Sequence, residues 1–235
     1  EFAQADAISR NHANKLLTEL ADKVVAHFPD DKLGFIHEQF DASWNPIWSG
    51  WRKQGKNTIS IVGHGFQAAW FLMRASDLTE NGRTRYRQTA AKIIRQLLHH
   101  GVADATRGGF YNAYKREDAT LMWGSDKHWW QQAEAILALT LADRLNLVSS
   151  QQAWKARSQA IDFYFKHFVD PAGGEFDVVD EQGHPTKDAV KGSMGKSTYH
   201  SVEFARYMLL YLFPGCSGNI VLQSKTTPGN VPEVD

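Results

Sequence analysis

Three histidines stand at nearly equal intervals along the chain, at positions 64, 128 and 200. Each opens a segment in which aromatic and other apolar residues recur at helical spacing. The unperturbed pKa of imidazole is about 6.5, so histidine can take up or release a proton near neutral pH. The regular interval predicts a repeated structural unit, and equivalent positions of such units face one common surface. We therefore expect the three helix starts to converge on one cavity.

Tryptophan is the residue type in clear excess. The chain has eight, at positions 44, 48, 51, 70, 123, 129, 130 and 154. Indole rings bury a large apolar area, so the simplest expectation for most of them is core packing. The C–H faces of a sugar ring also stack on indole. The clustering of the tryptophans favours that role for Trp44, Trp129 and Trp130.

Apolar periodicity predicts six helices. We expect them over residues 7–28, 63–76, 80–100, 128–145, 149–168 and 197–213. The second is apolar on almost every side, Phe71 included, and the fourth carries an apolar run from Ala133 to Ala142, so both should be buried. The third has one apolar stripe among many charged residues, which is typical of an outer, half-exposed helix.

Glycine-rich stretches separate the predicted helices. Residues 108–114 and 173–179 each begin with two glycines and read as strand-like, and 180–183 predicts a hairpin turn. We expect extended structure and loop over 35–48 and a polar loop over 55–60. The repeated unit is thus a strand-like stretch, a buried inner helix and an outer amphipathic helix.

This alternation predicts an all-α fold, an α/α toroid with short β-hairpins between the helix pairs. Three inner and three outer helices make about half of a closed ring. No change in composition marks a linker, so we expect residues 1–215 to form one domain and the polar residues 216–235 a poorly ordered tail. Half a ring exposes apolar edges, so we expect either self-association or a missing N-terminal half that completes the barrel.

The bulk composition excludes several classes of protein. Hydrophobic residues make up 43% of the chain and charged residues 22%, which is ordinary for a globular protein. The formal net charge is zero, so we expect neither a nucleic acid nor a membrane surface as partner. The single cysteine, Cys216, excludes an intrachain disulfide and is compatible with the cytoplasm. No spacing of histidines with cysteines or carboxylates predicts a metal site, and we expect no cofactor.

Four kinds of motif are spread along most of the chain. They are Gly63-His64 with Ala68 and Trp70, the run Trp129-Trp130-Gln131-Gln132-Ala133-Glu134-Ala135, Lys196 with Tyr199-His200, and the Gly-Gly-aromatic stretches at 108–111 and 173–176. Together they resemble the N-acylglucosamine 2-epimerase family, which includes cellobiose 2-epimerases and mannose isomerases. The resemblance covers roughly residues 7–213 and implies a fold similar to the second half of an (α/α)6 barrel.

The resemblance also implies a sugar substrate and an activity, either 2-epimerisation or aldose–ketose isomerisation. In the family, the histidines that match His64 and His200 are the acid and base that move the proton on C2 through an enediolate. For substrate binding we expect Trp129, Trp130, Gln67, Glu134, Tyr199, Lys196 and Trp44.

Some of these assignments have structural alternatives. Glu134 could equally bond a neighbouring inner helix, and Lys196 could only cap a loop. For His128 we expect a capping or packing role, because Trp129 beside it is the better candidate for sugar stacking.

Two positions depart from the family patterns and keep other functions open. Gln67 stands where a glutamate is expected, and Glu203 stands where an arginine often follows the second histidine. An amide can orient an imidazole but supplies no charge, which favours as an alternative a non-catalytic carbohydrate-binding or structural half-barrel. Glycoside hydrolysis is the third possibility and needs two inward carboxylates, for which Asp41, Asp126 and Glu134 are candidates without a recognisable pairing.

Overall fold

The computed structural model of the chain describes residues 7–31, 34–79 and 82–212. The predicted tail over 216–235 lies outside these described residues. Six α-helices lie within them, close to the predicted bounds: α1 (Ala7–His27), α2 (Val62–Leu78), α3 (Arg83–His99), α4 (Trp129–Arg144), α5 (Gln151–Phe163) and α6 (Tyr199–Leu212). None of these described helices is long and apolar enough to cross a membrane.

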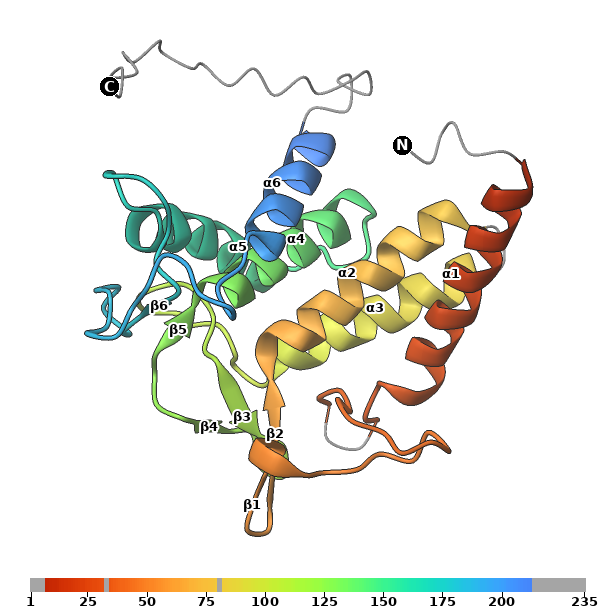
Figure 1. Ribbon diagram of the computed structural model, residues 1–235, viewed down its shortest axis with the longest axis horizontal. Coiled ribbons are helices and arrows are strands. Elements are labelled where there is room, and N and C mark those ends of the chain that lie inside the picture. The colour runs from red at the N-terminus through yellow and green to blue at the C-terminus, as the bar shows by residue number, and fades with distance from the viewer. Residues whose placement is uncertain (1–6, 32–33, 80–81, 213–235) are drawn as a thin grey trace, which may run out of the picture.

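The helices form an inner and an outer layer (Figure 1). Helix α4 packs against α2 on one side and α6 on the other, while α1 and α3 pack on α2 and α5 packs on α4. Helix α4 is buried continuously from Gln131 to Ala142, because it has no charged face to turn toward water. The predicted alternation of inner and outer helices, an α/α toroid, is confirmed.

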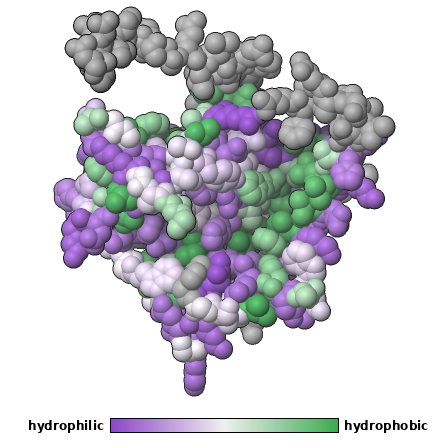
Figure 2. All heavy atoms as spheres, in the orientation of Figure 1, coloured by the Kyte–Doolittle hydropathy of each residue, from purple (hydrophilic) through white to green (hydrophobic). Residues whose placement is uncertain are grey.

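One face of the inner layer is open. Phe71 in α2, expected to be buried, is 41% exposed, and Leu78 at the end of that helix is 54% exposed. Leu16 and Leu20 on α1 are exposed as well. Figure 2 shows apolar side chains gathered on the surface over α1 and α2. We call Leu16, Leu20 and Leu78 the α1–α2 edge. Phe71 is exposed because it faces a cleft that α2 shares with the starts of α4 and α6.

Short antiparallel strands connect the helices. A four-stranded sheet has the order β1 (Lys53–Gln54), β2 (Asn57–Ile61), β3 (Ala113–Lys115), β4 (Thr120–Met122), and β5 (Lys127–His128) pairs with β6 (Val178–Val179). A 3-10 turn, Gly50–Arg52, precedes β1. Strand β2 leads directly into α2, and β5 leads directly into α4. The strands therefore fix where two inner helices begin.

The polar loop predicted over 55–60 is wrong. Gly55, with φ +64°, makes the turn of a hairpin between β1 and β2. Ile59 and Ile61 of β2 are buried and pair with Lys115 and Ala113 of β3. This partner strand lies more than fifty residues away, so its effect is not visible in the local sequence. Residues 35–48, by contrast, form only isolated bridges, Pro29 with Ile36 and Phe40 with Pro46.

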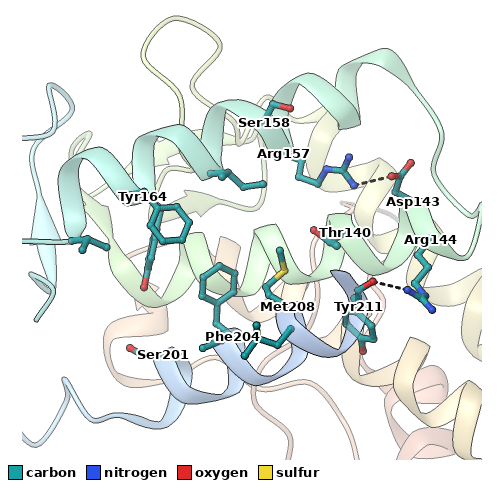
Figure 3. Close-up of a pocket in the computed structure, with 15 residues that line it drawn as sticks. Thr140, Asp143, Arg144, Arg157, Ser158, Tyr164, Ser201, Phe204, Met208 and Tyr211 are labelled. Carbon is teal, nitrogen blue, oxygen red and sulfur yellow. Dashed lines mark hydrogen bonds and ion pairs between the residues drawn. The ribbon is translucent and has the colours of Figure 1, made fainter. Parts of the chain in front are cut away.

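A groove runs over α4 between α5 and α6. Helix α5 begins at the N-cap Ser150 and continues into a π-helical turn, Tyr164–Phe168. The groove has a volume of about 820 Å³, and Phe204 and Met208 of α6 point into it opposite Tyr164 (Figure 3). Leu209 of α6, which also lines it, is 39% exposed. We call this the α5–α6 edge.

Candidate active site

A cleft of about 700 Å³ lies where the inner helices begin. Its lining includes His64 near the start of α2, His128 at the N-cap of α4 and His200 near the start of α6. The predicted convergence of the three histidine segments on one cavity is confirmed. Gln67, Trp129, Trp130, Lys196 and Tyr199 also line the cleft.

His64 is bound to a buried carboxylate. Its Nδ1 lies 2.9 Å from Oε2 of Glu38, whose side chain is 3% exposed. The other carboxylate oxygen, Oε1, accepts from the backbone N–H of Ile61 at 2.7 Å and from the hydroxyl of Ser60 at 3.1 Å. Arg52 contributes its guanidinium, with Nε 3.7 Å from Oε2. Glu38 thus joins the strand β2, the start of α2 and the imidazole.

His200 has a carboxylate partner of its own. Its Nδ1 lies 2.6 Å from Oε1 of Glu134, which is buried in α4. Oε2 of Glu134 accepts from the indole N–H of Trp70, and the amide of Gln67 donates to Oε1 at 3.3 Å. Glu134 therefore links all three inner helices, which matches the structural alternative expected for it. The described hydrogen bond of Gln67 supports this carboxylate and does not go to His64.

Trp130 lies against both imidazoles. Its ring centroid is 5.1 Å from that of His64 and 5.1 Å from that of His200. The ring nitrogens Nε2 of the two histidines have no hydrogen-bond partner among the described residues. Two imidazoles that are anchored through Nδ1 thus border one cleft, with their other nitrogens available.

The start of α4 holds these groups in place. The backbone N–H of Gly63 donates to Oε1 of Gln131 at 3.0 Å, which satisfies one of the free donors at the start of α2. A Cβ on Gly63 would lie 2.6 Å from Cζ3 of Trp130, so only glycine permits this approach of the two helices. Gln132 accepts from the N–H of Phe110 at 2.6 Å and donates to its carbonyl at 2.9 Å.

Trp129 is covered by Lys196. Trp129 is 5% exposed, and Nζ of Lys196 lies 4.5 Å from the centroid of its ring. The ammonium also pairs with Oε1 of Glu175 at 2.7 Å. Burial alone would raise the pKa of Glu175, but the hydrogen bonds it accepts, first that from Lys196, hold its pKa below the usual value. The face of Trp129 expected to stack on sugar is therefore occupied in part by a cation.

The exposed aromatic rings of the cleft are Tyr199 and Phe71. Tyr199 is 48% exposed and Phe71 is 41% exposed. The ring of Tyr199 lies edge-on to His200 at 4.9 Å. Partial burial raises the pKa of the Tyr199 hydroxyl, and the nearby carboxylate of Glu203 adds to this. Both rings offer apolar surface to a ligand.

His128 is a third imidazole of the cleft. Burial lowers its pKa, while the carboxylates of Asp177 and Asp126 act in the opposite direction. The lowered pKa leaves the ring uncharged at neutral pH. His128 therefore lines the site, in addition to the packing role expected for it.

The structure does not bring Trp44 to this cleft. Its ring stacks on His27 at the end of α1, 4.9 Å between centroids. The cause is local: Asp41 accepts from the backbone N–H groups of Ser43 and Asn45, and this tight turn directs Trp44 toward α1. The same turn occupies the carboxylate of Asp41. Asp126 is also not among the residues that line the cleft, so the carboxylate pair of a glycoside hydrolase is not assembled from the expected residues.

Sequence reasoning missed Phe71, which lines the cleft, and the two carboxylates Glu38 and Glu175, which bind the cleft residues His64 and Lys196. Glu38 follows the buried pair Phe35 and Ile36, and a carboxylate so close to core residues is the one local signal that could have found it. Glu175 lies within the Gly-Gly-aromatic stretch 173–179, whose sequence predicts only strand-like structure. Among the residues that the structure describes, no group of three or more His, Cys, Asp or Glu could hold a metal ion.

Comparison with solved structures gives the same fold. A cellobiose 2-epimerase from Bacillus thermoamylovorans matches with a TM-score of 0.67 at 21% identity, over 83% of this chain and 46% of that one. A cellobiose 2-epimerase from Spirochaeta thermophila matches with 0.65 at 17% identity, over 90% and 48%. A D-mannose isomerase matches with 0.66 at 20% identity, over 88% and 51%.

The chain thus spans about half the length of the solved structures that it matches. Its sequence matches the family described as N-acylglucosamine 2-epimerase (GlcNAc 2-epimerase) over residues 2–203. This match includes the start of every inner helix and both histidine–carboxylate pairs. The chain belongs to the N-acylglucosamine 2-epimerase family.

Proposed function

We propose that this chain carries the proton-transfer site of a sugar 2-epimerase or an aldose–ketose isomerase, with His64 and His200 as base and acid. One observation carries the proposal. Each imidazole is bonded through Nδ1 to a carboxylate, at 2.9 Å and 2.6 Å, and both lie against the same indole in one cleft. A carboxylate that accepts from Nδ1 orients the ring and stabilises the imidazolium that forms when Nε2 takes a proton.

The chemistry starts from the open-chain sugar. The neutral imidazole takes the proton from C2 through Nε2, and the electron pair of that C–H bond moves toward the C1 carbonyl oxygen to give an enediolate. The other ring, as imidazolium, returns a proton. Delivery to the opposite face of C2 with re-formation of the C1 carbonyl gives the epimer. In the isomerisation, the ring that took the proton delivers it to C1, while the hydroxyl proton on O2 moves to O1 and the carbonyl forms at C2, which gives the ketose.

The remaining cleft residues would bind the sugar. The open rings of Tyr199 and Phe71 and the indole of Trp130 offer apolar faces to its C–H groups. The indole N–H of Trp129 has no hydrogen-bond partner among the described residues, but it is buried, so it would donate to a sugar oxygen only after the residues that cover it move. Lys196 and Gln67 would donate to hydroxyl groups, while Glu134 acts through His200. The negative charge of the enediolate would be stabilised by the imidazolium and these donors.

The test is exchange of the C2 proton with solvent. Mannose, glucose and cellobiose would each be incubated with the chain in D2O and followed by proton NMR. We expect deuterium at C2 with the wild-type chain and a loss of at least about 100-fold for His64→Asn or His200→Asn, because each removes a proton-transfer group. His184→Asn is the matched control, since its side chain is 77% exposed and lies outside the cleft.

Two results would count against the proposal. Exchange that survives in both cleft variants would remove the histidines from the mechanism. A change of tryptophan fluorescence on adding sugar, without exchange in the wild-type chain, would favour the alternative of a non-catalytic carbohydrate-binding half-barrel.

A further inference from the structure

Glu38 contacts the reacting group without lining the cleft itself. We propose that Glu38 is a positioning residue, which holds His64 in the tautomer whose Nε2 can accept a proton. This inference rests on the proposed function, in which His64 is one of the two proton-transfer groups.

The two oxygens of Glu38 have separate tasks. Oε1 accepts from the backbone N–H of Ile61 at 2.7 Å and from the hydroxyl of Ser60 at 3.1 Å, and so fixes the carboxylate to the end of β2. Oε2 faces Nδ1 of His64 at 2.9 Å, with Nε of Arg52 at 3.7 Å. The carboxylate is therefore fixed to the backbone on one side and bonded to the imidazole on the other.

The Oε2 bond selects the tautomer. A carboxylate accepts hydrogen bonds and cannot donate them, so the Nδ1 that faces it carries the hydrogen of the neutral ring. The lone pair is then on Nε2, the nitrogen without a partner among the described residues. Glu134 does the same for His200 from α4, with Nδ1 to Oε1 at 2.6 Å. Both imidazoles are thus preset in one tautomer by carboxylates from different parts of the chain.

A purely structural role for Glu38 has to be separated from this one. Glu38 sits at the start of α2, where a carboxylate also stabilises the free N–H groups of a helix. Glu38→Gln separates the two tasks. Its amide oxygen can remain on Ile61 and Ser60, while its NH2 group faces His64. An NH2 group donates, so Nδ1 of the neutral ring would become the acceptor and the hydrogen would be on Nε2. In that tautomer Nε2 has no lone pair with which to accept the C2 proton.

The kinetic test compares Glu38→Gln with a matched control. We expect Glu38→Gln to lower the rate of C2 exchange by about 100-fold or more, as expected when a histidine is left in the wrong tautomer. Glu117→Gln is the control. Glu117 also accepts from β2, at the backbone N–H of Thr58 (2.9 Å), but is not bonded to His64. Its substitution should change exchange by less than about twofold.

A double variant tests whether Glu38 acts through His64. In the His64→Asn background, Glu38→Gln should cause no further loss of exchange, because the group that it orients is gone. Equal losses for the Glu38 and Glu117 variants, or a full additional loss in the double variant, would overturn the proposal.

The tautomer can be read without any activity. Long-range 1H–15N correlation spectra of the full chain distinguish the two nitrogens of a neutral imidazole. We expect His64 as the Nδ1–H tautomer in the wild type and as Nε2–H in Glu38→Gln, with the His64 signal assigned from His64→Asn. An Nε2–H tautomer in the wild type would overturn the proposal. A chain that shows the expected tautomers but no C2 exchange would instead contradict only the proposed function.

Discussion

Lys127, next to His128, is a fully buried ammonium. Its Nζ lies 2.8 Å from Oδ2 of Asp104, 2.7 Å from the carbonyl of Gly108 and 4.3 Å from the ring centroid of Phe163. Its side chain is 0% exposed. A charge removed from water in this way is tolerated only while its partners remain, so Lys127 ties the Gly-Gly turn to the strand that begins α4.

Asp104→Asn should therefore destabilise the protein strongly. The variant leaves the ammonium of Lys127 buried without its counter-charge, which costs about 3–5 kcal/mol of unfolding free energy. Urea denaturation followed by circular dichroism measures this. Asp118→Asn is the control, because the Asp118–Lys115 pair is far more exposed than the pair of Asp104 and Lys127, with Asp118 49% exposed and Lys115 24% exposed. A change as small as that of the control would show that the pair contributes little.

The loss of unfolding free energy in Asp104→Asn should also depend on pH. Burial alone would raise the pKa of Asp104, but the bond from Lys127 and backbone N–H groups hold it below the usual value. A lowered carboxyl pKa contributes stability above the unfolded pKa, about 3.9, and this stability is lost as pH falls through the folded value. The wild type and Asp104→Asn should thus approach equal stability in acid.

At this scale the sequence identified the proton-transfer candidates but not their partners. His64 and His200 were found because each lies within a short motif. Glu38 meets His64 only through the packing of residues 35–48 against β2, a tertiary contact that no local pattern records. Trp44 was predicted to bind sugar and does not line the cleft. Its clustering with other tryptophans gave no information on the turn that directs it to α1.

At the scale of elements, the start of α4 organises the cleft. Residues close together in its first turns contact different neighbours. Trp130 packs on both imidazoles, and Gln131 bonds the start of α2. Gln132 bonds the Gly-Gly turn, and Glu134 bonds His200. Long apolar runs indicated the inner helices, because a helix that is buried on most sides is apolar around most of its circumference. It missed β2, because the strand is defined by a pairing with the distant β3.

Gly63→Ala tests the contact between α2 and α4. In a helix interior alanine is more favourable than glycine by about 1 kcal/mol, so the substitution would stabilise α2 if the Cβ had room. Here the Cβ would lie 2.6 Å from Trp130 and 2.7 Å from Cγ of Gln131, and such overpacking costs about 1–3 kcal/mol. We expect a net loss of stability in thermal unfolding and a lower rate of C2 exchange.

The control is Gly192→Ala, where a Cβ would meet no atom within 4 Å. It should leave both measurements close to the wild type. A Gly63→Ala chain that is more stable than the wild type would mean that Trp130 moves aside at little cost.

At the scale of the whole molecule, the arc of helices ends in two apolar edges. The α1–α2 edge exposes Leu16, Leu20 and Leu78, and the α5–α6 edge exposes Leu209 beside its groove. Exposed apolar side chains that gather in this way mark candidate interaction surfaces. Self-association, expected from the sequence, stays a prediction, and the structure supplies the surfaces on which to test it.

Sedimentation velocity would test this prediction directly. We expect species larger than the 26.5 kDa chain that grow with concentration. Leu78→Glu and Leu209→Glu, one on each edge, should each shift the distribution toward monomer, because a charge at an apolar contact is costly to desolvate. Met194→Glu is the control, since Met194 is fully exposed on a loop. A monomer at all concentrations for the wild type would contradict the prediction.

The segment over residues 35–48 has a consequence for how the protein loses function. Apart from the buried side chains of Phe35 and Ile36, it is held to the described chain mainly by isolated bridges and by the bonds of Glu38, whereas Glu134 lies within a buried helix. Segments with few backbone bonds open locally at a lower free energy than the core. Mild denaturant would then disconnect His64 from its carboxylate while the helices persist. Under the proposed function, loss of C2 exchange would precede unfolding, because the Glu38–His64 pair would separate at a lower denaturant concentration than the Glu134–His200 pair.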